Sequence, residues 1–450
     1  MKERLRVAIN AQLSPDGASG GTVTVLRALA SLARLEDGAE EYVFIGPHDA
    51  PEWLRSMLPP HQQVVPGPAP VEWSADRLEP FKRALGPLRP AVRSIKRIIN
   101  ATTQTAEGVA VGLATSKYRA PAPPKNFYEG LGCDVIHFPF QSYEPCGLPT
   151  IYNPHDLQHL HHPEFFSPSE IARRERLHPA ACHAAHTVVV ASNFVKRDVA
   201  ERYGIDTSKV QVIPWAPPSL PESTAATRAT DMSLILSKYA LSERRFALYP
   251  AMTWEHKNHI RLLEALARLR DREGLRLRFV FTGYKTDFWP SVERRMFELK
   301  LEEQVSFLGL VAREELSALY RAAQFVFIPT LFEAASAPVF EAWQHEAPVA
   351  CSSVTSLPEQ AAGAALLFDP CDVEAIAVAL ARMATDEDLL DALRQRGARR
   401  LDDFSLERTA KAYRAVYRRA AGRELDEEDR TLLGWDWMRG RSQVARQGVE

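Results

Sequence analysis

Segments typical of buried strands alternate with segments typical of amphipathic helices through both halves of the 450-residue sequence, and this alternation most limits the fold. Strands that alternate with helices build parallel sheets, because a parallel neighbour is reached only through a crossover, usually a helix. Continuous apolar runs fit such strands, since both faces of the sheet are covered. The predicted strands lie at residues 7–9, 42–45, 134–138, 149–153, 187–190, 210–213, 246–249, 277–281, 305–308, 325–328 and 364–368.

A proline-rich linker divides these strands into two sets. Residues 214–223, with the sequence PWAPPSLPES, carry no periodicity, and such segments mark domain boundaries. A chain of this length also exceeds what one hydrophobic core usually supports. We therefore predict an α/β protein with two Rossmann-like, doubly wound parallel-sheet domains, at residues 1–215 and 216–403.

Composition and charge favour a soluble enzyme and argue against a nucleic-acid partner. Apolar residues make up 46% of the sequence, charged residues 25%, and the net charge is -2, whereas a nucleic-acid role calls for a strongly basic domain. The 5 cysteines are scattered and form no CxxC pair, which favours reduced thiols. There is no signal-peptide pattern and no apolar run of about 18 residues, so we expect a cytoplasmic protein.

Residues 82–119 differ from the rest of the chain in charge. They hold eight Lys or Arg residues and one Glu, a net charge of +7, beside an apolar stripe of Val92, Ile95, Ile98 and Ile99. A basic amphipathic helix can lie on an anionic membrane, which would make the protein peripheral at the inner face. A solvated helix packed on its own domain is the alternative.

Residues 325–343 combine a strand, a loop and a helix start in an order that suits a phosphate. Ser336 is a typical cap, and Pro338 fits the first turn, where its missing N–H costs nothing. The free N–H groups and the positive end of such a helix attract anions. Two carboxylates frame the turn, Glu333 in the loop and Glu341 inside the helix.

Two features of the first half lie where open α/β sheets bind ligands, after the carboxyl ends of strands. The glycine-rich loop at residues 14–21 ends in Gly20 and Gly21, and it fits a flexible turn as well as a ligand-facing loop. His155 follows the strand at 149–153. A histidine at this position is suited to act as a general acid, a general base or a hydrogen-bond partner. An ordinary surface histidine in a loop is the alternative interpretation.

Four histidines in the segment that begins at residue 154 raise the question of a metal. Imidazoles at this density can bind a metal ion, and two of them have i, i+4 spacing. Pro154 and Pro163 leave little room for the helix that this spacing needs, so we expect no metal site. The four are His155, His159, His161 and His162.

These features together resemble the GT-B glycosyltransferases, in particular the retaining family 4 enzymes. The likeness rests on an E-x7-E element at Glu333 and Glu341, an upstream lysine at Lys257 and an Asn153-Pro-His-Asp segment in the other half. It runs from Val7 to about residue 420. The resemblance implies that the domains face each other across a cleft, and that a helix in residues 404–450 returns to the first domain before a charged tail.

The resemblance also assigns roles to particular residues. Lys257 would stabilise the departing diphosphate, Glu333 would bind the transferred sugar, and His155 would approach that sugar from the acceptor domain. Glu341 would accept the ribose hydroxyls, and the Gly20–Gly21 pair would leave room between donor phosphate and acceptor. The remaining donor-binding residues implied are Thr253, Gly309, Leu310, Val311, Ser336, Ala337, Pro338 and Val339.

Three positions depart from the family pattern. Met252 stands where the family often has an arginine, so Lys257, His256 or His259 would have to supply the missing charge. Residues 334–336, Ala-Ala-Ser, replace the usual glycines after the first glutamate. Thr22, which is uncharged, follows the glycine pair.

The expected function is transfer of a hexosyl group, mannosyl or glucosyl, from a UDP- or GDP-linked sugar with retention of configuration. The acceptor would be a glycan, a lipid-linked sugar or a small molecule, as in polysaccharide biosynthesis, and no metal cofactor is expected. Two alternatives stay open: a non-catalytic subunit that binds nucleotide sugars or glycans, and a nucleotide-sugar epimerase with the GT-B fold.

Overall fold

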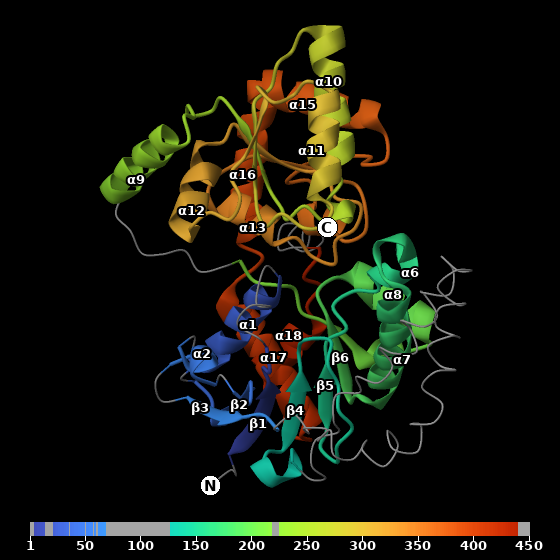
Figure 1. Ribbon diagram of the computed structural model, residues 1–450. Helices are drawn as coiled ribbons and strands as arrows, with labels where there is room; N and C mark the ends of the chain where they lie inside the picture. Colours follow the sequence, from blue (N-terminus) through green and yellow to red (C-terminus); the bar gives the residue numbers. More distant parts are fainter. Residues whose placement is uncertain are drawn as a thin grey trace, which may run out of the picture.

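The computed structural model describes residues 4–13, 21–35, 37–49, 51–56, 58–59, 62–68, 127–217 and 225–439. These residues form two α/β domains, one above the other in Figure 1. The basic segment at residues 82–119, with its predicted membrane contact, and Gly20 lie outside the described residues. None of the described helices has the length and hydropathy needed to cross a membrane.

The N-terminal domain contains a sheet of seven strands, all parallel, in the order β3-β2-β1-β4-β5-β6-β7. Most strand residues are buried, as their apolar runs require. The strands are β1 (Leu5–Asn10), β2 (Glu40–Gly46), β3 (Gln63–Pro66), β4 (Val135–Phe138), β5 (Thr150–Tyr152), β6 (Thr187–Val190) and β7 (Val210–Val212).

Short and long helices connect these strands, and α6, α7 and α8 lie together at one side of the domain (Figure 1). Ser192 caps α8 by accepting a hydrogen bond from the N–H of Val195, and Gly204 ends that helix with a left-handed backbone. The helices are α1 (Gly21–Leu32), α2 (Pro51–Arg55), η4 (Glu129–Leu131), α6 (Gln158–His161), η5 (Pro163–Phe165), α7 (Pro168–Ala184), α8 (Asn193–Tyr203) and η6 (Thr207–Lys209).

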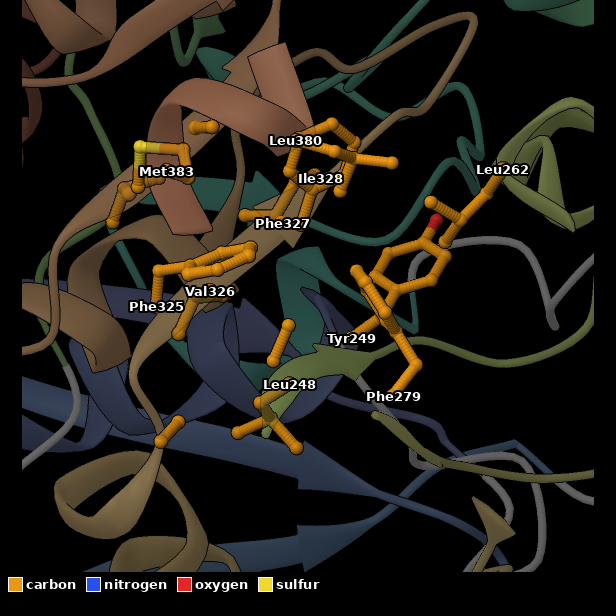
Figure 2. Close-up of a cluster of buried hydrophobic side chains, with 14 of the residues drawn as sticks. Leu248, Tyr249, Leu262, Phe279, Phe325, Val326, Phe327, Ile328, Leu380 and Met383 are labelled. Atoms are coloured by element: carbon orange, nitrogen blue, oxygen red, sulfur yellow. The ribbon is translucent and has the colours of Figure 1, made fainter. Parts of the chain in front are cut away.

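The C-terminal domain contains a parallel sheet of six strands in the order β10-β9-β8-β11-β12-β13. Its core gathers the side chains of the central strands against the helices, and Figure 2 shows ten of them labelled, among them Tyr249, Phe279 and Phe327. The strands are β8 (Ala247–Pro250), β9 (Phe279–Thr282), β10 (Val305–Phe307), β11 (Phe325–Ile328), β12 (Val349–Ser352) and β13 (Leu366–Phe368).

The helices that follow the linker belong to this second domain up to α16. They are α9 (Ala225–Lys238), η7 (Glu255–Lys257), α10 (His259–Glu273), α11 (Trp289–Glu298), α12 (Arg313–Ala322), α13 (Ala337–Gln344), α14 (Leu357–Ala361), α15 (Val373–Thr385) and α16 (Glu387–Leu401).

The last two helices, α17 (Leu406–Ala420) and α18 (Glu427–Gly434), lie against the N-terminal domain (Figure 1). The buried face of α17 joins the N-terminal core, and a polar network fixes it there. His137 Nε2–H donates to Asn153 Oδ1 at 2.8 Å, so its Nδ1 accepts from the hydroxyl of Tyr417 at 2.9 Å. Asn153 in turn donates to the hydroxyl of Tyr413 at 3.1 Å. The strands β4 and β5 and the helix α17, far apart in the sequence, are therefore joined in one domain.

The two tryptophans of the tail pack on the body of the protein. Trp437 is buried in the N-terminal core, and Trp435 packs against that core. The buried guanidinium of Arg400, on α16, donates to the carbonyl of Met438 at 3.1 Å. The tail thus contacts both domains.

Candidate active site

The site predicted for the C-terminal domain lies at the point where the strand order of its sheet reverses. β8 and β11 are neighbours there, although two strands and their crossovers separate them in sequence, and ligands of open α/β sheets bind at such switch points. Lys257 follows β8 and Glu333 follows β11. Their side chains form an ion pair, with Lys257 Nζ 2.5 Å from Glu333 Oε1. The pair is mostly sheltered, with side-chain exposures of 20% and 12%.

The loop that carries Glu333 is held by hydrogen bonds from the segment after β12. The hydroxyl of Thr355 accepts from the N–H of Glu333 at 3.0 Å and donates to its carbonyl at 2.7 Å. Ser356 donates to the same carbonyl at 2.8 Å. On the other side, the N–H of Leu331 donates to the carbonyl of His256 at 2.8 Å. The carboxylate is therefore presented by a fixed backbone.

Lys257 is fixed by its neighbours in the same way. Its carbonyl accepts from the hydroxyl of the buried Tyr249 at 2.6 Å. The next residue, Asn258, has a left-handed backbone with φ 61, which asparagine tolerates better than most residues. Its side chain donates to the carbonyls of Pro329 and Pro370, at 2.9 and 2.8 Å, and so ties the ends of three strands together.

The start of α13 has the character of an anion site. Ser336 caps the helix with an extended backbone, and both its N–H and its carbonyl bond to Gln360, at 2.9 and 2.8 Å. Its hydroxyl is buried and has no hydrogen-bond partner among the described residues. The first-turn residues Ala337, Pro338 and Val339 follow directly. A phosphate oxygen would pair with this hydroxyl and with the free N–H groups of the turn.

Glu341 lies on α13, one turn farther along the helix. Tyr320, on α12, donates its hydroxyl to Glu341 Oε2 at 2.7 Å. Burial raises the pKa of Glu341 above its ordinary value, and Tyr320, Arg313 and Arg27 oppose that shift. Arg27 comes from α1 of the other domain, so the electrostatic surroundings of Glu341 include groups from both halves of the chain.

The loops after β8, β9 and β10 are tied into one surface. Gly283 packs so tightly on the backbone of Ala251 that an added Cβ would lie 2.6 Å from its carbonyl oxygen, and its φ of +127 also requires glycine. Its N–H donates to the carbonyl of Gly309 at 2.9 Å. Beyond that contact, Leu310 is 73% exposed and Val311 packs against the core.

Thr253 belongs to the loop after β8, but its side chain does not reach solvent. Its side chain is fully buried, and its hydroxyl accepts from the N–H of Thr286 at 2.8 Å. A contact between Thr253 and a bound donor would need the loop to rearrange. The structure therefore gives Thr253 a role in holding the loops after β8 and β9 together.

His155 stands after β5 in the N-terminal domain, with a left-handed backbone at φ 64. Its Nε2–H donates to the carbonyl of Pro139 at 2.6 Å, which leaves Nδ1 as an acceptor in the neutral ring. Burial lowers the pKa of His155, and this favours the neutral form. Pro139 follows β4, next to the switch point between β1 and β4, and Gly21 begins α1 after β1.

The other three histidines of that segment have carboxylate partners. His159 bonds to Glu175 at 2.9 Å, His161 to Asp198 at 2.8 Å and His162 to Glu164 at 3.1 Å. In the part of the chain that the structure describes, no three His, Cys, Asp or Glu residues gather in a way that could hold a metal ion.

The structure corrects one expectation about the missing arginine at Met252. His256 and His259 were candidates to replace its charge, but burial lowers the pKa of His256 to about 2 and that of His259 to about 3. Both rings are neutral near pH 7. Of the three residues named, only Lys257 can contribute a positive charge.

The sequence did not single out Tyr320, Gln360, Thr355 or Arg27. Tyr320 and Arg27 occur in ordinary amphipathic helices, and nothing in their local patterns separates them from core and surface positions. Thr355 and Gln360 lie in a segment too short and too polar to predict as an element. Their roles depend on contacts between residues far apart in the sequence.

Two family sequence models match this chain. The model of glycosyl transferases group 1 matches residues 235–400, which include Lys257, Glu333 and Glu341, and the model of Glycosyltransferase Family 4 matches residues 112–216, which include His155. Each model matches less than half of the chain, so the chain is similar to the group 1 glycosyltransferases in its C-terminal domain and to Glycosyltransferase Family 4 in its N-terminal domain. One match falls in each domain, and the GT-B architecture agrees with them.

Individual relatives are similar to this chain over parts of their length. The O-antigen chain mannosyltransferase B of Escherichia coli is 28% identical over 272 residues, covering 58% of this chain and 69% of the relative. The MMP alpha-(1->4)-mannosyltransferase of Mycolicibacterium hassiacum is 32% identical over 168 residues, covering 36% and 40%. The matches thus leave about a third or more of each relative unaligned.

Solved structures show the same fold. An Anabaena protein, HepE, in complex with UDP and glucose superimposes with a TM-score of 0.62 and 14% identity, covering 92% of this chain and 99% of that one. This likeness supports two Rossmann-like domains in the GT-B arrangement.

Proposed function

We propose that this chain transfers a hexosyl group, with mannosyl as the first choice, from a nucleotide-diphosphate sugar to a glycan or lipid-linked acceptor with retention of configuration. The observation that carries the proposal is the Lys257–Glu333 pair at the β8/β11 switch point, 2.5 Å apart. A sheltered cation and carboxylate at this place suit a ligand that combines a diphosphate with a sugar.

The chemistry follows from where charge develops. When the bond between the anomeric carbon and the β-phosphate oxygen breaks, negative charge grows on the departing diphosphate. Lys257 would contact that charge, together with the hydroxyl of Ser336 and the N–H groups at the start of α13. Glu333 would bind the sugar hydroxyls near the reacting carbon, and Glu341 the ribose hydroxyls. His155 would offer its Nδ1 to a sugar hydroxyl from the other domain, beside Gly20 and Gly21.

The choice of sugar and acceptor rests on the relatives. The E. coli and Mycolicibacterium proteins are named as mannosyltransferases, and the first of them as an O-antigen chain enzyme. A polysaccharide or lipid-linked acceptor would fit that comparison. The nucleotide of the donor would be GDP or UDP.

A donor-binding protein without turnover is the alternative, and Met252 favours it. The family's arginine is absent, and the neighbouring histidines are neutral, so Lys257 alone among these residues would stabilise the leaving group. Saturable donor binding with no product across a broad acceptor panel would support this alternative. Conversion of the nucleotide sugar without any acceptor would indicate an epimerase.

The proposal is tested in two steps. A thermal-shift screen with GDP, UDP and ADP and their sugars selects the donor, since a ligand of the folded state raises the melting temperature. Transfer from that donor to glycan and lipid-linked acceptors is then followed by release of the nucleoside diphosphate, and proton NMR of the product gives the anomeric configuration. An inverted product would overturn retention, and no melting shift with any nucleotide would overturn the donor class.

A further inference from the structure

The first turn of α8, in the N-terminal domain, is held by two residues of the C-terminal domain. The N–H of Phe194 donates to Glu359 Oε1 at 2.8 Å. The ring of the same residue meets the ring of Phe332 edge-on, with centroids 6.1 Å apart. Phe194, in the N-terminal domain, therefore contacts the C-terminal domain through both its backbone and its side chain.

Phe332 is buried, with 3% of its surface exposed. Besides Phe194, its ring approaches His161 with centroids 5.5 Å apart and His162 with centroids 6.2 Å apart. These partners all belong to the N-terminal domain. Phe332 is also the residue directly before Glu333, so its burial fixes the site loop against the other domain.

Glu359 belongs to the segment that holds the same loop from behind. Thr355 and Ser356 bond to the backbone of Glu333, and Gln360 bonds to the residue that caps α13. Glu359 stands between these residues on α14 and points to the N-terminal domain through its contact with α8. The segment that positions the C-terminal half of the site thus also carries the carboxylate that bonds to α8.

The carboxylate of Glu359 accepts a hydrogen bond from a backbone N–H in the first turn of α8. Its own cap, Ser192, accepts from the N–H of Val195 and leaves the N–H of Phe194 to another acceptor. A carboxylate at a helix N-terminus also meets the positive end of the helix dipole. Burial raises the pKa of Glu359, and the N–H of Phe194 and the charge of Arg197 oppose that shift.

The C-terminal tail adds a second contact to the same turn. Asn193 donates its side-chain amide to Asp436 at 3.3 Å. Two residues later the tail carbonyl of Met438 accepts from Arg400 of α16. The tail therefore contacts both domains at their junction, beside the contact of α8 with α14.

We propose that Glu359 and Phe332 are positioning residues, which dock the first turn of α8 and thereby set the angle between the two domains. Through this angle they align the N-terminal residues Gly21 and His155 with Lys257 and Glu333. The catalytic consequence rests on the proposed function, whereas the docking itself does not. Neither residue is assigned a contact with substrate.

The docking is tested by the distance between the domains in the full chain. One spin label is attached to the exposed Cys371 and the other to Arg202→Cys, at the far end of α8. Electron–electron double resonance measures the distance between the two labels. Every sample also carries Cys146→Ser, which removes a partly exposed thiol. We expect a narrow distribution in the parent and a distribution at least twice as broad in Glu359→Ala. The Glu359→Gln variant keeps an acceptor oxygen, so it should resemble the parent. Glu302→Ala, at an exposed position before β10, is the matched control.

A second readout separates positioning from substrate contact. If the donor selected above supports turnover, Glu359→Ala should lower kcat at least tenfold while the Kd for the nucleoside diphosphate changes less than twofold, and Glu359→Gln should restore most of kcat. An unchanged distance distribution in Glu359→Ala would overturn the proposal, whatever the activity. If Glu359→Ala does not fold, Phe332→Leu gives the same test, because it keeps an apolar side chain and removes the ring.

Discussion

The Lys257–Glu333 pair is the decisive feature at the scale of single residues. Two opposite charges 2.5 Å apart, mostly sheltered from water, are each bound to a backbone that further hydrogen bonds hold in place. Charge-assisted hydrogen bonds of this kind are strong, so the pair keeps the cation beside Glu333 before any ligand arrives. A diphosphate that binds there competes with Glu333 for the lysine.

Removal of the carboxylate charge should therefore have opposite effects on nucleotide binding and on sugar transfer. In Glu333→Gln, the lysine loses its ionic partner and should bind a nucleoside diphosphate about threefold more tightly, a gain of about 0.6 kcal/mol. Transfer should fall about 100-fold, because the amide no longer stabilises positive charge on the sugar. Calorimetric titration and turnover measure the two effects. Turnover equal to that of the parent would remove Glu333 from the site.

The arginine that the family often has can be restored. Met252→Arg places a second cation near Lys257, and we expect about tenfold tighter binding of the nucleoside diphosphate, or about 1.4 kcal/mol. Met252→Gln, similar in length and uncharged, is the control and should leave the Kd within about twofold of the parent. If both variants bind alike, charge at position 252 has no part in donor binding.

At the scale of elements, α17 packs on the N-terminal domain although it follows the C-terminal domain in sequence. The network from Tyr417 through His137 and Asn153 to Tyr413 is buried, and each member has a partner. Arg418, also on α17, forms an ion pair with Glu40 at the start of β2, at 2.7 Å. The element therefore acts as part of the first domain, although it follows the second in sequence.

The network predicts the cost of single hydroxyl deletions. Tyr417→Phe leaves the Nδ1 of His137 buried without a partner, which should lower the free energy of unfolding by about 1–3 kcal/mol. Tyr284→Phe is the matched control, since Tyr284 is 58% exposed, and should change stability by less than about 0.5 kcal/mol. Urea unfolding of both variants measures this. Equal midpoints would show that the network does not stabilise α17.

The sequence predicted the elements whose pattern is local and strong. The strands at 187–190 and 325–328 were placed at their observed bounds, because each consists only of β-branched or aromatic residues, which favour strands. It missed β3, which is short and lies at the sheet edge, and α14, which has five residues. It also missed β12, since the run Val349–Ser352 mixes apolar and small polar residues.

The candidate site was predictable only in part, for a similar reason. Glu333, Glu341 and Lys257 were found from their order along the chain and their place after strands. The partner of Glu341, Tyr320, was not, because a hydrogen bond between two helices leaves no pattern in either. The docking of Phe194 between Phe332 and Glu359 joins residues more than 130 positions apart, so no local signal could indicate it.

At the scale of the whole molecule, buried histidines make stability depend on pH. Burial lowers the pKa of His137, His178 and His259 to about 3, of His256 to about 2 and of His345 to about 4. In the unfolded chain each titrates near about 6.5. As the pH falls below that value, the unfolded state binds protons that the folded state does not, and stability is lost, by up to about 1.4 kcal/mol per pH unit for each histidine.

We therefore expect the melting temperature to fall between pH 7.5 and pH 5.5. The raised pKa values of Glu341 and Glu359 act in the opposite sense, but they are fewer. His259→Phe should make the fall smaller and raise stability at pH 5.5, because neither ring nitrogen of His259 has a partner among the described residues and its ring packs on Tyr249 and Phe281. Calorimetric scans at the two pH values measure this, and a constant melting temperature would contradict it.

The central claim joins both domains in one reaction on a nucleotide sugar, and it depends most directly on the cation at Lys257. The measurement is the rate at which the purified protein releases a nucleoside diphosphate from GDP-mannose or UDP-glucose in the presence of acceptor, compared with that of Lys257→Met. Methionine has a similar length and no charge, so the fold should stay intact. We predict that the parent releases the nucleotide and that the variant is at least about 100-fold slower, a loss of about 2.7 kcal/mol of transition-state stabilisation. Equal rates in the folded variant and the parent would contradict the account.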